Sequence, residues 1–143
     1  MTRYIVASLS ILFAVAIGVS NGEENCKQAV SKLLKYQMTS ITKCTKELGF
    51  KGKEKTEKMN CIMKCVLIAS GGMNPDGTLE IENGLKFILE NIPLEVIDKA
   101  LIGSAKCQRF AEAGVIDPTE ATCKSYEPFI KCLTNFIMTL CGK

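Results

Sequence analysis

Cysteine is the residue type in this chain that has the most chemistry to offer. The sequence holds eight cysteines and no histidine. The missing histidine excludes Ser-His and Cys-His nucleophile pairs, histidine zinc sites and the imidazole pH switch. All-thiolate metal sites or disulfides remain for the cysteines, which are Cys26, Cys44, Cys61, Cys65, Cys107, Cys123, Cys132 and Cys141.

The start of the chain predicts the compartment in which these cysteines work. Arg3 precedes an apolar run over residues 5–17, and small and polar residues follow as far as Gly22. This order is typical of a secretory signal peptide. The run is too short for a good membrane span, which needs about 20 apolar residues. We predict a signal peptide over residues 1–22 and a secreted, extracellular domain over residues 23–143, with an uncleaved anchor as the alternative.

Secretion favours disulfides over metal binding. All eight cysteines lie in the predicted mature part, and an even number in an oxidising compartment indicates disulfides. Metal sites made of thiolates typically contain Cys-x-x-Cys pairs, which the sequence lacks. We therefore expect no metal and no cofactor. Spacing alone does not decide how the cysteines pair.

Length, composition and net charge indicate one globular domain without a nucleic-acid partner. A chain of 143 residues is one ordinary domain, and 47% hydrophobic with 23% charged residues is a globular composition. The formal net charge of +3 is too small to indicate a nucleic-acid partner.

The elements that must position the cysteines have helical periodicity. Apolar residues recur at 3.6-residue spacing over residues 26–48, which predicts an amphipathic helix ending at Gly49. Residues 50–58 predict a loop or a short exposed helix, and residues 59–69 a buried helix. Residues 70–77 form a break, and Thr78 is the expected cap of a helix that continues to Pro93.

Two further helices complete the prediction. One covers residues 94–114. The other starts at Asp117 as cap with Pro118 in its first turn, and it kinks or restarts at Pro128. No segment alternates long enough to predict a strand. We expect an all-α fold, a compact bundle of about six helices cross-linked by disulfides.

Helical geometry indicates how the cysteines are used. Cys61 and Cys65 are four residues apart, so they share one face of a helix and suit two parallel tethers to other helices. Cys123 and Cys132 are nine apart, which would put them on opposite sides of one helix. That helix would be joined to a different neighbour on each side.

The chain resembles the insect odorant-binding proteins in its cysteine spacing and in two short segments. The resemblance rests on Cys61-Ile-Met-Lys-Cys65, the long gap to Cys107, and the eight residues between Cys123 and Cys132. Residues 44–50, CTKELGF, are similar to the end of that family's first helix. Residues 74–79, NPDGTL, are similar to the loop after its third helix. The signal peptide and the size also fit.

The resemblance implies three interlocked disulfides, Cys44–Cys65, Cys61–Cys123 and Cys107–Cys132. With these formed, Cys26 and Cys141 are left over, and we predict that they join the first helix to the tail. The alternative register takes Cys26 as the first family cysteine and Cys141 as the last, which changes the pairing. The segment from Cys44 to Cys61 is short for the family, which predicts a reduced second helix.

The resemblance also implies a function. Members carry a small hydrophobic molecule, such as an odorant or pheromone, in an apolar cavity inside the helical bundle, and they are not enzymes. The expected lining combines apolar side chains with Tyr126, or else Thr134, as a polar contact: Met38, Ile41, Met63, Leu67, Leu85, Ile88, Ile97, Leu101, Tyr126, Phe129, Leu133 and Ile137.

Other partners and one rival function stay open. The Lys-rich stretch over residues 43–58 is a solvated surface or a docking face for a chemosensory receptor or an anionic membrane. The protein is expected as a monomer or homodimer. The alternative function is a secreted helical interaction protein, such as a venom, salivary or signalling factor, with a solid core and no ligand.

Overall fold

The computed structural model describes residues 22–142. The predicted signal peptide, residues 1–22, lies outside this range except for Gly22. Within the described part, the chain forms six α-helices and no strand, which confirms the all-α prediction. The helices are α2 (Gly22–Leu48), α3 (Glu54–Glu57), α4 (Met59–Ala69), α5 (Ile81–Asn91), α6 (Ile97–Ala105) and α7 (Glu127–Thr139). Short 3-10 turns are η1 (Leu94–Val96), η2 (Gln108–Ala111) and η3 (Lys124–Tyr126).

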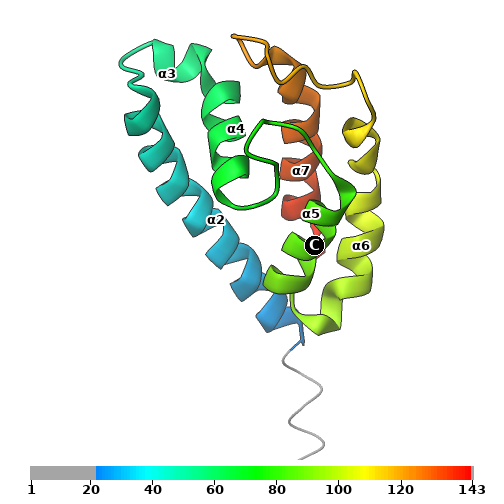
Figure 1. Cartoon of the computed structure of the whole chain (residues 1–143). Coiled ribbons are helices and arrows are strands. Elements are labelled where there is room, and N and C mark those ends of the chain that lie inside the picture. Colours follow the sequence, from blue (N-terminus) through cyan, green and yellow to red (C-terminus); the bar gives the residue numbers. More distant parts are fainter. Residues whose placement is uncertain (1–21, 143) are drawn as a thin grey trace, which may run out of the picture.

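The helices form a bundle in which α2 runs along one side (Figure 1). The chain turns through the short α3, and α4 then packs back against α2. Helix α6 packs against both α5 and α7, and η1 reaches across to α2. The carboxyl end of the chain lies close to the amino end of α2, where Cys26 and Cys141 are bonded. No helix among residues 22–142 combines the length and apolar character that crossing a membrane requires.

The first helix ends as its sequence predicts. Helix α2 stops at Leu48, and Gly49 follows with φ +74°. This left-handed conformation is readily adopted by glycine and terminates helices, since it turns the chain away from the helical path. The segment that follows holds only α3, which is four residues long and contains no buried residue. The expected reduced second helix is therefore present as a single turn.

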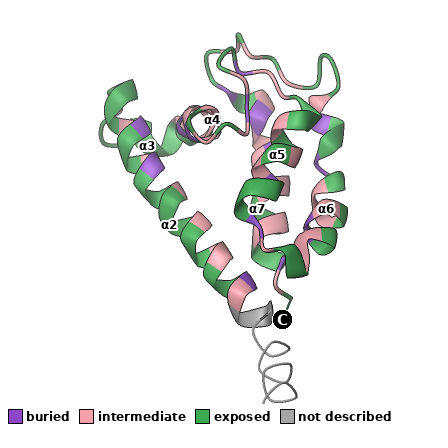
Figure 2. Cartoon of the chain, turned by 60° about the horizontal axis from the view of Figure 1, so that its bottom comes forward, coloured by how far each residue is buried: buried purple, intermediate pink, exposed green. Residues whose placement is uncertain are grey.

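The core consists of three clusters of buried side chains, and cysteines take part in each. Figure 2 marks the buried positions along the ribbon in purple, and α2 carries both buried and exposed positions. One cluster centres on Phe110, Tyr126 and Phe129 between the loops and α7. A second joins α2, α5, α6 and the tail. The third joins α2 to α4. The second cluster holds Cys26, Ile88, Ile92, Ala100 and Leu140, and the third holds Cys44, Ile62 and Val66.

Each of the four disulfides lies within one of these clusters, and the described residues contain no free cysteine. On α4, Cys65 is bonded to Cys44 of α2, and Cys61 is bonded to Cys123 before η3. The other two bonds are Cys107–Cys132 and Cys26–Cys141. Three of these pairs are the ones that the resemblance implies, and Cys26–Cys141 is the pair that we predict from the two remaining cysteines. The two cysteines of α4 serve as tethers to two different segments.

The last helix begins nine residues later than its sequence suggests, at Glu127 in place of Pro118. Asp117 caps a turn and not a helix, because its Oδ1 accepts from the backbone N–H of Thr119 at 2.9 Å while α7 begins only at Glu127. Between them Cys123 has φ +54°, a left-handed conformation that an α-helix cannot contain. Cys123 and Cys132 therefore do not share a helix. Pro128 lies in the first turn of α7, so the predicted restart at that residue is confirmed.

Two other boundaries differ from their predictions. Thr78 does not cap α5, which starts at Ile81. Its hydroxyl instead donates to Asp76 Oδ1 at 2.6 Å and closes the loop before the helix. The helix expected over residues 94–114 is divided into η1, α6 and η2. Helix α6 ends at Ala105, just before Cys107 is held by its disulfide to α7.

Candidate ligand-binding cavity

A cavity of about 170 Å³ lies between α2, α4, α5 and α7. Its floor is made by apolar side chains that are almost fully buried. An apolar cavity of roughly 150 Å³ is enough to hold a benzene-sized molecule. The cavity can therefore accommodate a small organic molecule. The buried floor residues are Val66, Ile88, Ile92, Cys107 and Phe129.

Seven residues expected in the lining are brought together around the cavity. They come from α4, α5 and α7, so the lining is assembled from helices that are distant in sequence. These residues are Met63, Leu67, Leu85, Ile88, Phe129, Leu133 and Ile137.

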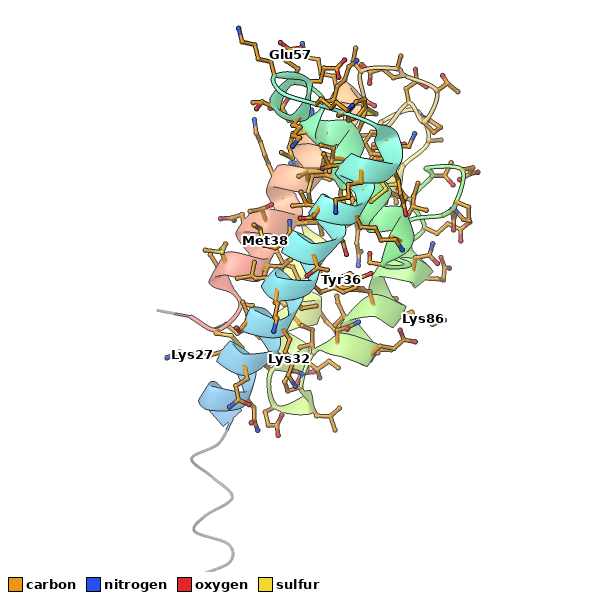
Figure 3. The ribbon with its side chains drawn as sticks, turned by 90° about the vertical axis from the view of Figure 1, so that its left-hand side faces the viewer. Lys27, Lys32, Tyr36, Met38, Glu57 and Lys86 are labelled. Carbon is orange, nitrogen blue, oxygen red and sulfur yellow. A yellow bond between two sulfur atoms is a disulfide. The ribbon has the colours of Figure 1, made fainter. Side chains whose placement is uncertain are left out.

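Met38 does not line the cavity, and its side chain is 66% exposed. The face of α2 that lines the cavity carries Leu33, Tyr36 and Gln37, which recur at the i, i+3, i+4 spacing of one helical face. Met38 is about 200° around the helix from Tyr36 and therefore points elsewhere. Both residues are labelled on α2 in Figure 3. The flexible, apolar character of methionine misled the prediction.

Three other expected lining residues pack into the core clusters instead. Ile41 lies one turn beyond Gln37 and contacts the cluster of Cys44, Ile62 and Val66. Ile97 and Leu101 pack against the cluster that joins α5, α6 and the tail. The helical pattern correctly marks these side chains as partly buried. It does not distinguish a core contact from a cavity wall.

Tyr126 also lies outside the lining, because its hydroxyl is already used. The side chain is fully buried, and the hydroxyl donates to the backbone carbonyl of Gly77 at 2.6 Å. Burial raises the pKa of this phenol above its ordinary value, and the nearby Asp117 carboxylate adds to the shift. Lys64 Nζ lies 5.1 Å from the ring centroid. Tyr126 is a structural residue that holds the loop before α5.

Several lining residues were not foreseen. Leu33, Val66 and Ile92 belong to the apolar pattern and could have been selected from it. Tyr36, Gln37 and Phe87 carry no such signal, since their position depends on how α2 and α5 face each other. The lining residues outside the prediction are Leu33, Tyr36, Gln37, Val66, Ser70, Gly72, Leu79, Glu80, Ile81, Gly84, Phe87, Ile92, Ser104, Cys107, Gln108, Ala111, Ile130 and Phe136. Thr134, named in the prediction as the alternative polar contact, also lies in the lining.

The serine and threonine hydroxyls of the lining are bonded to their own helices or turns. Ser70 Oγ donates to the Leu67 carbonyl at 2.9 Å, and Ser104 Oγ to the Leu101 carbonyl at 3.1 Å. Thr134 Oγ1 donates to the carbonyl of Ile130 at 2.9 Å. Among the described lining residues, Glu80 is the one charged side chain, and it is exposed. The described lining therefore combines a mostly apolar surface with no positively charged side chain.

Among the described residues, which include all eight cysteines, no free thiolate is available to a metal. Sγ of Cys44 and Cys65 and a carboxylate oxygen of Glu47 lie within 4.8 Å of one another, at the end of α2. The two sulfurs are bonded to each other in a disulfide. Thiolate is the form of cysteine that ligates metals, so this group lacks two of its three ligands.

Comparison with protein families gives one match. The profile of the PBP/GOBP family matches residues 22–136, which include every helix but the last three residues of α7. The chain belongs to this family, the insect odorant-binding proteins. PBP/GOBP proteins are secreted binding proteins and not enzymes, and they take up small hydrophobic ligands. Searches of curated proteins and of solved structures found no match to the chain.

Proposed function

We propose that this PBP/GOBP protein is a secreted carrier, which holds a small hydrophobic odorant, pheromone or similar semiochemical in the cavity between α2, α4, α5 and α7. The observation that carries this proposal is the hollow itself. Removing core volume ordinarily costs a protein stability. Here the disulfides stabilise the shell, at typically about 2–4 kcal/mol for each bond, so an apolar space can remain within it.

The cavity favours the carrier over the alternative of an interaction protein with a solid core. A protein with a solid core would fill the space between its helices. Here about 170 Å³ of apolar space is left, and buried Val66, Ile88 and Phe129 line it. The pattern of residues 1–22 and the complete disulfide bonding of the described cysteines support secretion. The Lys-rich residues 43–58 as a receptor or membrane face, and the monomer or homodimer, stay predictions from the sequence.

Ligand uptake can be tested by displacement of a fluorescent apolar probe with a panel of small volatile molecules. We expect at least one class to displace the probe with a micromolar dissociation constant, which corresponds to about −8 kcal/mol. If the protein bound neither the probe nor any volatile molecule of the panel, the cavity would not be a ligand site.

Two matched variants on α5 locate the site. Leu85 lines the cavity, whereas Leu89, one turn later on the same helix, is 63% exposed. Leu85→Trp should fill the space and weaken binding about tenfold or more. Leu89→Trp should leave binding unchanged. Equal effects of the two variants would place the ligand outside this cavity.

A further inference from the structure

The cavity has one partly buried polar side chain that is not bonded to its own backbone. Gln37 of α2 lines the cavity, and its Nε2 donates to Sδ of Met63 on α4 at 3.9 Å. A thioether sulfur is a weak hydrogen-bond acceptor, and this contact is long. Among the described residues, it is the sole side-chain hydrogen bond of Gln37 that the structure shows. The amide is thus a strong donor with a poor partner.

The other polar lining residues differ from Gln37. Ser70, Ser104 and Thr134 donate to carbonyls of their own segments. Tyr36 and Gln108 are exposed, so their polar groups are accessible to water. Because a hydrogen bond is worth more away from water, the partly buried Gln37 amide is the group best placed to recognise a polar atom on a bound ligand.

The electrostatics of the lining restrict what that atom can be. The described lining contains no lysine or arginine, and the exposed Glu80 is negatively charged. A carboxylate ligand would lose its hydration without gaining a positive partner, and it would approach a like charge. An uncharged oxygen would replace a weak sulfur acceptor with a strong one and would meet neither penalty.

Taken with the carrier function on which it rests, this arrangement leads to a ligand class. We propose that Gln37 is a specificity-determining residue, and that the cavity selects uncharged apolar molecules with one oxygen acceptor, such as a ketone or an alcohol, over the matching hydrocarbon and carboxylate. On binding, the ligand oxygen accepts a hydrogen bond from the amide N–H of Gln37 and replaces Met63 Sδ as its acceptor. The remainder of the ligand contacts the apolar walls.

The test uses ligands that share one carbon skeleton: octane, 2-octanone, 2-octanol and octanoate. Each displaces the same fluorescent apolar probe from the full mature chain, and the dissociation constants are compared between variants. Gln37→Leu keeps the size and the helix propensity of the residue but removes the amide. We expect it to weaken 2-octanone and 2-octanol about threefold to tenfold, as the loss of one hydrogen bond does, and to leave octane unchanged or tighter.

The matched control is Gln28→Leu, the same substitution at an exposed residue of α2 that does not line the cavity. It should leave the ratio of 2-octanone to octane affinity as in the parent protein. Met63→Leu removes the competing sulfur and keeps the amide, so the ratio should be retained or raised. These two variants also keep the proposal testable if Gln37→Leu does not fold.

The failures of the two proposals are distinguishable. If no member of the series displaces the probe from any variant, the carrier function fails. If octane and 2-octanone bind and Gln37→Leu changes both equally, the role of Gln37 is overturned while the carrier function stands. Octanoate binding more tightly than 2-octanone, or Gln28→Leu or Met63→Leu abolishing the preference, would also overturn it.

Discussion

Tyr126 and Gly77 are 49 residues apart in sequence, and the buried hydroxyl of Tyr126 donates to the carbonyl oxygen of Gly77 at 2.6 Å. The same ring carries Lys64 on one side, and Lys64 Nζ donates to the carbonyl of Pro118 at 2.8 Å. One tyrosine and one lysine therefore join both long loops to α4 and α7. The loop at Gly77 leads directly into the cavity wall at Leu79, Glu80 and Ile81.

Removing the hydroxyl should weaken the fold without touching the ligand site. Tyr126→Phe leaves the Gly77 carbonyl without its donor, and a buried unsatisfied group costs about 1–3 kcal/mol. We expect urea unfolding to show a loss of this size and probe displacement to show no change in affinity. Tyr36→Phe is the control for stability, since Tyr36 is 47% exposed. If Tyr126→Phe lowered the affinity for the probe without lowering the unfolding free energy, Tyr126 would be a ligand contact and not a structural residue.

Gly77 has no room for a side chain. Its φ is +86°, and a Cβ would lie 2.6 Å from Lys64 Cε and 2.7 Å from the Tyr126 hydroxyl. Gly71 has a similar φ of +77°, but nothing lies within 4 Å of its Cβ position. Both alanine variants incur the cost of a left-handed residue, about 1–2 kcal/mol, while only Gly77→Ala adds overpacking.

Thermal and urea unfolding of the two alanine variants should therefore differ. We expect Gly77→Ala to lose about 1–3 kcal/mol more than Gly71→Ala. Equal losses would mean that the loop can move away from Tyr126 without cost.

The bond between Cys26 and Cys141 should contribute more stability than a short-range bond. It joins residues separated by 115 positions, whereas Cys44–Cys65 spans 21. In the chain-entropy account, the longer loop is worth about 1–2 kcal/mol more. When each pair is replaced by alanines, we expect the unfolding free energy to fall more for Cys26/Cys141 than for Cys44/Cys65. Non-reducing peptide mapping should recover the four bonded pairs, and a free thiol at Cys26 would remove the basis of this comparison.

Acidification to pH 5.5 should change neither stability nor affinity strongly. Hydrogen bonds from Thr78, Thr119 and Ser125 hold the pKa values of Asp76, Asp117 and Glu120, respectively, below their ordinary range. A lowered folded pKa gives stability that is present above the unfolded pKa and is lost as pH falls through the folded value. Since ordinary carboxyl pKa values lie near about 4, these groups stay ionised at pH 5.5.

We therefore expect ligand affinity to change less than about tenfold, or 1.4 kcal/mol, between pH 7.4 and 5.5. The chain has no histidine to titrate in this window, and Cys141 ties the tail to α2. One ligand titrated at both pH values measures this. A much larger loss at pH 5.5 would contradict it. Below about pH 4 the unfolding free energy should fall, and Asp117→Asn should reduce that fall relative to the exposed control Glu112→Gln.

The sequence by itself determined the helices that are defined by local forces. The 3.6-residue periodicity of residues 26–48, and Gly49 after it, specify α2 and its end. The apolar run of residues 59–69 specifies α4 with the same bounds, and the cysteine spacing with the family resemblance leads to the four bonded pairs. These features depend on neighbours in the chain, or on a pattern that is itself written in the sequence.

Tertiary structure alone decided the start of α7 and the identity of the cavity wall. Asp117, Pro118 and Glu120 have the residue types of a helix start, but the chain at Cys123 adopts a left-handed conformation where it meets Cys61 of α4. In the same way, a helical pattern marks Ile41, Ile97 and Leu101 as inward-facing without saying what they face. Whether such a side chain meets another side chain or an empty space depends on how the helices cross, and that is fixed by contacts between distant segments.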